Sequence, residues 1–527
     1  MVTVGGFFNV LMKNNIIFLG FICCFYLIGM SYADAAKKDK GASRVQFQDV
    51  IAKARVLSDT PFQEPGKDLP DILKKMEYDQ WRDIRFKPTR SLWSGQPFSL
   101  QFFHLGFLYQ HPVIVHYVDQ YGTHQFPFSS NLFEYANNGL KEYLPEDYGF
   151  GGFRVHYPLN TQKYADELVV FLGASYFRAL GRDMTYGISA RGLGVNTAED
   201  IGEEFPLFRE FWIVHPSSQA KSIKIYALLD SNSVTGAYEF TVEPGVETVM
   251  KVNSVLFIRQ HIQKIGIAPL SSMFFYGKNT GFKGDGDFRP EVHDSDGLAV
   301  NARSGEWIWH PLLNPTRLLV NSFSGGAPFG FGLLQRDIDF DHYQDLEARY
   351  DRRPSVWVSP KGDWGKGHLE LVQIPTNNEY NDNIVAYWVP ERAFERGDCV
   401  KYAYALYWYS AGHTHSSKGF VQATRVVKKP GEVMFVIDFI GDEFKVALKD
   451  KTLVPDVWVS QGAHLSDIQL LKNTATDGWR LVLHVQLDAV GPMKLGLTNQ
   501  NPAIEFRAFL KDKTSAVTET WSYTYLP

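Results

Sequence analysis

From Tyr78 onward the chain consists of short apolar runs separated by Gly, Pro, Asn and Asp, and this pattern most constrains the fold. Apolar and polar residues alternate within the runs, which predicts β-strands rather than helices. Helical spacing is confined to the segment Val45–Met76. Many strands at short spacing with few helices predict a large antiparallel β-sandwich. The first strands we expect are Phe98–Leu108, Val113–Tyr117, Leu168–Leu172, Phe211–Val214, Ile223–Leu229, Ala237–Val242 and Val249–Ile258.

The length of 527 residues exceeds what one hydrophobic core organises, so two large domains are expected. The strand pattern breaks around Tyr387–Asp398, a stretch with a proline and many charges. We therefore assign residues 45–390 to a large β-sandwich domain, 391–399 to a linker and 400–527 to a second domain. The strand candidates after the break suit an immunoglobulin-like sandwich in number and spacing.

The N-terminus has the pattern of an export signal, which we assign to residues 1–35. Lys13 supplies a positive charge, an apolar run follows, and Ala33-Asp34-Ala35 offers small residues for cleavage. Met12 is a second candidate start of the protein. A retained membrane anchor is the alternative, but the apolar run is shorter than the ~20 residues of a typical span.

Composition excludes some classes of partner. A net charge of −5 without a long basic run argues against nucleic acid. Two of the three cysteines lie in the export signal, so Cys399 is alone in the mature chain and no intrachain disulfide is expected. An aromatic share of 15% suits a β protein with stacking surfaces.

The loop Arg289–Leu298, RPEVHDSDGL, concentrates charged groups among aromatic residues. Carboxylates beside aromatic rings are typical of carbohydrate sites, because sugar C–H faces stack on rings while carboxylates bind hydroxyls or move protons. A polar turn with aspartates capping backbone donors is the alternative, and burial is the more frequent role of any single aromatic residue. The candidate substrate-binding and catalytic residues here are Arg289, His293, Asp294, Asp296, Trp307 and Trp309.

A second polar loop, Thr376–Asn383, carries Glu379 and Asp382 directly before an apolar strand. Glycoside hydrolysis needs two carboxyl groups from separate elements, so Asp382 could face Asp294 across a groove. A solvated hairpin is the alternative. Asp363, within a glycine-rich turn, is held as a reserve acid, and Tyr350 is a candidate substrate contact. We expect no cofactor and no metal: His413 and His415 lack a third ligand, and the aspartates do not fit a calcium loop.

Several motifs resemble a known family. They are YGFGGFRV at 148–155, FLGASYFRA at 171–179 and YGISARGL at 186–193, followed in order by EFP at 204–206, RPEVHDSDGL and NEYNDNIVAYW. Together they resemble the periplasmic glucans biosynthesis protein family of G and D types (OpgG/MdoG and OpgD), from about Val45 to the C-terminus. The G type is our narrower expectation.

The resemblance implies a periplasmic protein with a sugar-mutarotase/lyase-like sandwich and a smaller immunoglobulin-like domain. It implies a role in making osmoregulated glucans with β-1,2-linked backbones, and an inverting endo-β-1,2-glucanase activity. The family's general acid falls on Asp382 and its general base on Asp294, while Glu379 and Tyr350 fall on groove positions. Tyr380 replaces the threonine of the D-type pattern, which puts that local sugar contact in doubt.

Two other functions stay open at this point. A non-catalytic scaffold would bind nascent glucan and hand it to branching enzymes. A mutarotase or lyase rests on fold analogy alone. Partners to test are β-1,2-glucan, the inner-membrane glucan synthase and a second copy of the chain as a homodimer.

Overall fold

The structure is a computed structural model, in which residues 43–527 form one compact unit. It describes residues 43–66, 69–136, 141, 144, 148–280, 286–410, 418–442, 453–488, 502–513 and 515–527. The expected export signal and the pair His413 and His415 lie outside the described residues. Within the described part, no helix is both long and apolar enough to cross a membrane.

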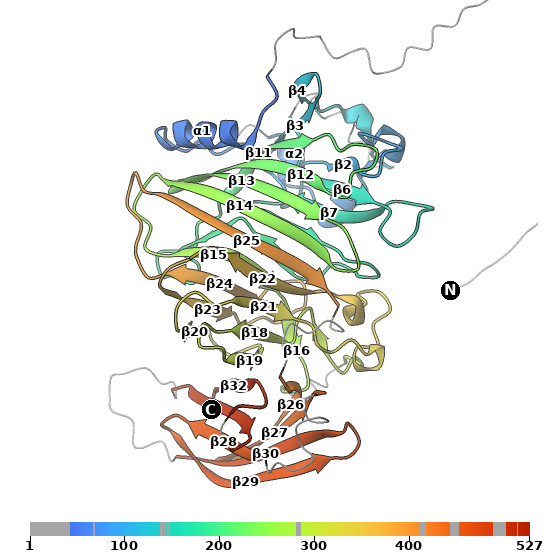
Figure 1. Ribbon diagram of the computed structural model, residues 1–527. Coiled ribbons are helices and arrows are strands. Elements are labelled where there is room, and N and C mark those ends of the chain that lie inside the picture. The colour runs from blue at the N-terminus through green and yellow to red at the C-terminus, as the bar shows by residue number, and fades with distance from the viewer. Residues whose placement is uncertain are drawn as a thin grey trace, which may run out of the picture. The chain divides into compact units, whose positions relative to one another are not determined.

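Strands dominate the described chain, which confirms the all-β prediction (Figure 1). One sheet of ten strands runs in the order β2-β6-β7-β8-β9-β15-β24-β23-β20, with β10 paired to β15. Its strands are β2 Ser99–Phe103, β6 Gly152–Tyr157, β7 Asp166–Leu172, β8 Tyr176–Ala179, β9 Ser189–Arg191, β10 Leu193–Val195, β15 Ile265–Ser272, β20 Leu319–Ser324, β23 Gly367–Gln373 and β24 Ile384–Pro390.

A second sheet has fourteen strands in the order β28-β31-β32-β19-β18-β21-β22-β25-β14-β13-β12-β11-β3-β4. Its pairs are antiparallel except β3 with β11 and β19 with β32. Its strands are β3 Ile114–Asp119, β4 Gly122–Gln125, β11 Leu207–Val214, β12 Ile223–Asp230, β13 Val234–Glu243, β14 Thr248–Ile258, β18 Gly297–Asn301, β19 Trp307–Pro311, β21 Gly330–Leu334, β22 Ser355–Lys361, β25 Cys399–Tyr409, β28 Val454–Val459, β31 Ile504–Lys511 and β32 Thr520–Tyr525.

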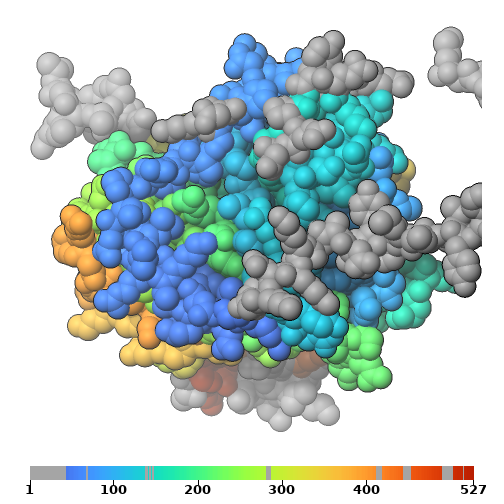
Figure 2. Space-filling model, turned by 90° about the horizontal axis from the view of Figure 1, so that it is seen from above, coloured from blue at the N-terminus to red at the C-terminus, as the bar shows by residue number. Residues whose placement is uncertain are grey.

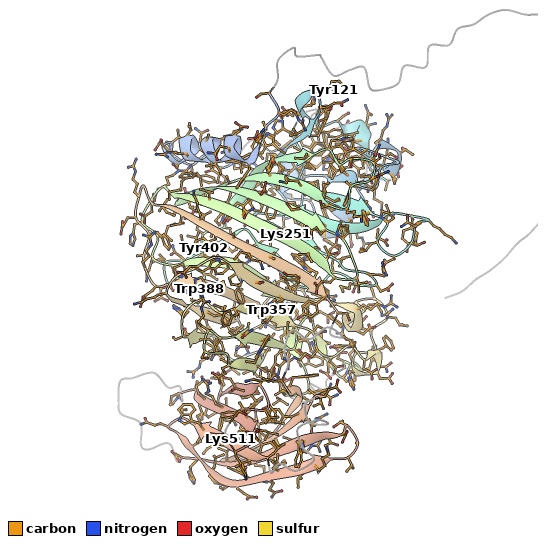
Figure 3. All side chains as sticks on the ribbon, viewed as in Figure 1. Tyr121, Lys251, Trp357, Trp388, Tyr402 and Lys511 are labelled. Atoms are coloured by element: carbon orange, nitrogen blue, oxygen red, sulfur yellow. The ribbon has the colours of Figure 1, made fainter. Side chains whose placement is uncertain are left out.

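The two sheets face each other across an aromatic core, as a sandwich requires. Phe171 of the ten-stranded sheet packs edge-on against Phe240 of the other, with ring centroids 5.2 Å apart, and Phe153 meets Phe211 at 4.9 Å. Trp388, on the ten-stranded sheet and labelled in Figure 3, is fully buried in this core. Burying each such ring contributes roughly 1.5–3 kcal/mol.

Helix α1 covers part of the outer face of the fourteen-stranded sheet. Helix α1 follows the expected helical spacing and packs Val50 and Ala54 against β12, β13 and β14. Residues of the N-terminal segment, blue to cyan, gather on the face seen in Figure 2. The helices and remaining two-stranded pairs are α1 Phe47–Ser58, α2 Asp71–Lys74, α3 Tyr78–Arg82, η2 Pro88–Arg90, η3 Ser130–Leu132, η5 Phe340–His342, η6 Tyr350–Arg352, β1 Arg85–Phe86 with β5 Phe133–Glu134, and β16 Phe274–Tyr276 with β17 Val292–His293.

The C-terminal part is a two-layered sandwich. One layer is the four-stranded sheet β26 Phe420–Lys429, β27 Glu432–Ile440, β30 Gly478–Leu487 and β29 Ala463–Asn473, in that order. The other layer is β28, β31 and β32, and Phe435 packs against Phe506 between the layers at 4.8 Å. This arrangement agrees with the sandwich architecture expected for the second domain.

The expected domain boundary needs correction. Strand β25, Cys399–Tyr409, which we assigned to the start of the second domain, lies between β14 and β22 in the fourteen-stranded sheet. The expected linker was residues 391–399. Cys399 belongs to β25, and residues 391–398 connect β24 to β25, with Phe394 among them buried against Ile262. A strand with a partner on each side belongs to the large sheet, so the C-terminal sandwich begins after Tyr409.

A buried ion pair joins the C-terminal sandwich to the large sheet. Arg336 donates to both carboxylate oxygens of Glu519, at 2.6 and 3.0 Å, and to the carbonyl of Val421 at 2.9 Å. The Glu519 side chain is fully buried. Its charge therefore depends on Arg336 for compensation.

We predict that Arg336→Ala lowers the free energy of unfolding by about 3–5 kcal/mol, because it leaves a buried carboxylate without its counter-charge. The matched control is Lys75→Ala, which removes the exposed pair with Asp71 and should cost less than about 1 kcal/mol. Urea unfolding of both variants measures the difference. Equal losses would contradict a structural role for the buried pair.

Candidate functional site

Asp294 follows β17 and is almost fully buried, with 4% of its surface exposed. Its backbone N–H donates to the Met273 carbonyl at 2.8 Å, and its Oδ1 accepts a hydrogen bond from Arg353 at 2.5 Å. Burial raises the pKa of Asp294, and the charge of Asp382 raises it further, while Arg353 and Arg178 oppose the shift. Asp294 is thus a carboxyl group that releases its proton less readily than an exposed aspartate.

Asp382 is held at the mouth of β24 by its neighbour Asn383. The buried Asn383 side chain accepts from the N–H of Phe274 at 2.8 Å and donates to the carbonyls of Phe274 and Ile374 at 3.0 and 3.1 Å. These bonds fasten the Asp382 loop to β16, the partner strand of β17, which leads into Asp294. Asp382 itself is 30% exposed and faces Arg178 across 4.0 Å. The two acids predicted from separate loops are therefore brought together.

A second group of candidate residues lies next to the acid pair and consists of Tyr350, Glu379 and Arg289. The guanidinium of Arg353 lies over the Tyr350 ring at 4.5 Å. Burial raises the pKa of Tyr350, and the charges of Glu379 and Asp294 raise it further. Glu379 pairs with Arg289 at 2.7 Å. Arg289 also lines an open cavity of about 830 Å³ together with Phe275, Tyr276, Asp287, Phe288, Asp345 and Glu347.

His293 and Asp296 do not face the acid pair, and their polar contacts are with other residues. His293 is fully buried, with its ring nitrogens near Gln335 at 2.9 Å and Glu291 at 3.1 Å. The Asp296 carboxylate accepts backbone N–H groups of Arg336 and Asp337. His293, Asp296 and Asp337 line a small cavity of about 40 Å³ together with Thr424 of the C-terminal sandwich. The segment RPEVHDSDGL therefore contributes Asp294 to the acid pair and His293 and Asp296 to a separate buried cluster.

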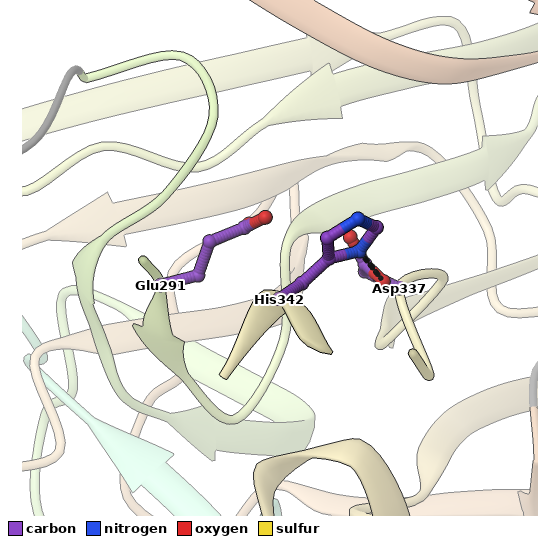
Figure 4. Close-up of side chains that lie close together, drawn as sticks. All are labelled: Glu291, Asp337 and His342. Atoms are coloured by element: carbon purple, nitrogen blue, oxygen red, sulfur yellow. Dashed lines mark hydrogen bonds and ion pairs between the residues drawn. The ribbon is translucent and has the colours of Figure 1, made fainter. Parts of the chain in front are cut away.

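Glu291, Asp337 and His342 form the one group in the described residues whose ligand atoms lie close enough together to hold a metal ion (Figure 4). His342 Nδ1 lies 2.7 Å from Asp337. The ammonium of Lys278 forms ion pairs with both Asp337 and Glu291. Since a lysine already balances these carboxylates, we assign the cluster to the buried charges of the junction rather than to a metal.

The remaining candidates lie away from the acid pair. Trp309 is buried beneath the guanidinium of Arg336, 3.6 Å from its ring, and Trp307 stacks on Trp357 at 5.5 Å, both in the core of the C-terminal junction. Asp363 is exposed and accepts the N–H of Gly365 at 2.9 Å, which is the turn-capping alternative. Packing and capping explain these three residues.

Sequence reasoning missed the two arginines that face the acids. Arg178 of β8 donates to Ser189 at 2.9 Å and faces Asp382, and Arg353 follows η6. Tyr109 and Tyr176 also lie close enough for the charge of Asp382 to act on them; burial raises the pKa of Tyr176 to about 12. Arg178 lies within FLGASYFRA, one of the motifs shared with the family, but the sequence gives no sign that it lies next to Asp382.

Comparison with known proteins agrees with the resemblance. The family described as "Periplasmic glucan biosynthesis protein, MdoG" matches residues 45–525. Glucans biosynthesis protein G of Ralstonia nicotianae is 44% identical over 494 residues, which are 91% of this chain and 96% of that protein. The chain belongs to the MdoG family of periplasmic glucan biosynthesis proteins. Membership gives it a periplasmic role in glucan biosynthesis.

Two solved structures show remote likenesses. An α-galactosidase from Geobacillus stearothermophilus, in complex with raffinose, is 8% identical over 49% of this chain and 39% of its own, with a TM-score of 0.25. A polysaccharide lyase is 8% identical over 72% of this chain and 44% of its own, with a TM-score of 0.19. At these TM-scores neither likeness bears on the fold or the activity.

The position of Asp296 predicts a pH-dependent stability. Burial raises its pKa to about 6, so the folded protein binds this proton more tightly than the unfolded chain, whose aspartates titrate near pH 3.8. The free energy of unfolding therefore rises as the pH falls below about 6. The gain reaches its full size below pH 3.8, where Asp296 is protonated in the unfolded chain as well. Relative to Asp296→Asn, the wild type should gain on the order of 1 kcal/mol between pH 8 and pH 5.

Thermal unfolding of both proteins at the two pH values measures this gain. Asn keeps an acceptor oxygen for the backbone N–H groups, so the substitution isolates the charge. A stability difference that is the same at pH 8 and pH 5 would contradict the titration of Asp296 in this range.

Proposed function

We propose that this protein is an inverting endo-β-1,2-glucanase that processes the glucan chain in the periplasm. The observation that carries the proposal is the convergence of Asp382 and Asp294 from separate loops, close enough for one charge to shift the pKa of the other. Inversion requires two carboxyl groups on opposite sides of the linkage, about 6.5–9.5 Å apart, with water beside one of them. The family resemblance supports the β-1,2 linkage.

In this mechanism Asp382 is the general acid. It is the more exposed of the two acids, so its carboxyl group can reach the glycosidic oxygen of a bound chain and protonate it as the bond to the anomeric carbon breaks. Asn383 keeps the acid in place through its three hydrogen bonds. Arg178 lies on the same side and can hold a sugar hydroxyl.

Asp294 is the general base. Arg353 engages its Oδ1, and the other oxygen takes the proton from the attacking water. A carboxylate with a raised pKa is a stronger base than an exposed one, which suits this role. Tyr350, Glu379 and Arg289 form the adjoining wall, which we assign to substrate binding.

Several further assignments belong to the same proposal. Residues 1–35 act as a cleaved export signal, and β-1,2-glucan is the ligand. The inner-membrane glucan synthase and a second copy of the chain are partners to test by co-purification and by the mass of the protein in solution.

The non-catalytic scaffold remains the second candidate, because Asp294 is nearly sealed from solvent. Incubating the pure protein with linear β-1,2-glucan separates the two functions. A glucanase shortens the chain and releases new reducing ends as the α-anomer, whereas a scaffold leaves chain length unchanged.

We predict that Asp382→Asn lowers the rate of cleavage by about 10²–10⁴-fold while glucan binding persists, because the amide retains the shape of the side chain but has no acidic proton to transfer. The control is Asp363→Asn, at the exposed turn, which should cleave at the wild-type rate. Reducing-end release and calorimetric binding measure the two effects. Full activity in Asp382→Asn would remove this residue from the mechanism.

We also predict that Arg353→Met moves the acidic limb of the rate profile to higher pH. Arg353 lowers the pKa of Asp294 against the effect of burial, so its removal raises that pKa and the base is lost at a higher pH. Arg352→Met, at the exposed neighbouring position, is the control. An unchanged acidic limb in Arg353→Met would show that Asp294 does not set it.

A further inference from the structure

A row of aromatic side chains from the N-terminal segment adjoins the acid pair. We define the aromatic shelf as Tyr78, Trp81, Phe107 and Tyr109. Trp81 lies 4.6 Å from Tyr109, and Tyr78 lies 5.6 Å from Phe107 and 6.4 Å from Trp81, measured between ring centroids. Tyr78 is half exposed, and Trp81 and Phe107 are partly exposed.

Tyr109 connects the aromatic shelf to Asp382. Burial raises the pKa of Tyr109, while the charge of Arg178 lowers it and the groups of Tyr78 and Asp382 raise it. Its ring packs on Gly173, where an added Cβ would lie 3.3 Å from Cε1. Gly173 lies in the turn that leads into β8, and β8 carries Arg178, whose guanidinium lies 4.0 Å from Asp382. The shelf therefore adjoins the side of the acid pair that Arg178 occupies.

The hairpin that carries Phe107 is held in a strained conformation. Gly106 and Tyr109 exchange two backbone hydrogen bonds, of 3.0 and 2.9 Å. Phe107 has φ +55°, a left-handed conformation that favours glycine and strains other residues. The next residue, Leu108, is 73% exposed. The partly exposed Phe107 ring packs against Tyr78 at 5.6 Å and Tyr109 at 6.4 Å, so this conformation holds the ring within the aromatic shelf.

We propose that the aromatic shelf is a second arm of the carbohydrate groove, which stacks glucosyl units of the chain beyond Asp382. This inference rests on the proposed function and extends it. Pyranose rings present C–H faces that pack on aromatic rings, while their hydroxyls reach polar edges such as the Tyr109 hydroxyl and Arg178. From the shelf the groove would pass Arg178 and Asp382, then Asp294, whose partner Arg353 lies over the Tyr350 ring. It would end at Glu379 and the cavity lined by its partner Arg289.

Such a groove binds sugar units on both sides of the reacting linkage. A chain held at both arms places an internal linkage at the acids, and a short oligosaccharide occupies only the region of the acids. Loss of the shelf should therefore weaken binding of long chains and leave binding of short ones unchanged.

The test measures binding of linear β-1,2-glucooligosaccharides of increasing defined length, by calorimetry, in an Asp382→Asn background that removes hydrolysis. The variant is Phe107→Gly, because glycine suits φ +55° and preserves the hairpin while the ring is lost. We expect about two- to tenfold weaker affinity for the longest chains and an unchanged affinity for the shortest. The control is Asp183→Gly, an exposed polar residue with φ +62°.

A second variant, Tyr78→Ala, repeats the test at the half-exposed end of the shelf, with Tyr121→Ala at the exposed β3–β4 turn as its control. If both shelf variants bind every length as the parent does, or lose affinity equally at all lengths, the proposal is overturned. If the wild type fails to cleave glucan but the length-dependent loss appears, the shelf proposal stands and the catalytic proposal falls.

Discussion

The hydrogen bonds of Asn383 hold the candidate site together. They tie the loop before β24, in the ten-stranded sheet, to Phe274 of β16, the pair of strands that ends at Asp294. Without these hydrogen bonds, nothing in the Asn383 side chain would fix the loop of Asp382 relative to the strands that lead to Asp294. With these bonds, the acids share one electrostatic environment, in which Arg178 and Arg353 stand beside them. An amide that satisfies three buried backbone groups is costly to replace.

Neighbouring residues of one loop belong to two different groups of charged side chains. Asp294 faces the acid pair, whereas His293 and Asp296 belong to the buried charges at the junction with the C-terminal sandwich, where Lys278 and Arg336 provide the positive charges. In the first group the Asp382 side chain is partly exposed, and the second group joins two layers of structure. One loop thus couples the site to the C-terminal sandwich through neighbouring residues.

The all-β architecture followed from the alternation of apolar residues, because each strand buries one or both faces regardless of its distant partners. The assignment of β25 failed for the same reason: alternation identifies a strand but not its neighbours, and Cys399–Tyr409 pairs with strands some 50 and 150 residues earlier. Asp382, Asp294, Glu379 and Tyr350 were predicted from the sequence as candidate site residues, and that assignment stays a prediction. The packing of Trp307 and Trp309 and the pairing of Arg353 with Asp294 depend on tertiary contacts that residue spacing does not encode.

The central claim is that Asp382 and Asp294 flank one glycosidic linkage. A crystal structure of the Asp382→Asn variant with a linear β-1,2-glucooligosaccharide tests it most directly. We expect a glycosidic oxygen within hydrogen-bond distance of residue 382 and a water between Asp294 and the adjacent anomeric carbon. A chain bound on another face, or one whose linkages all lie out of reach of both side chains, would contradict the claim.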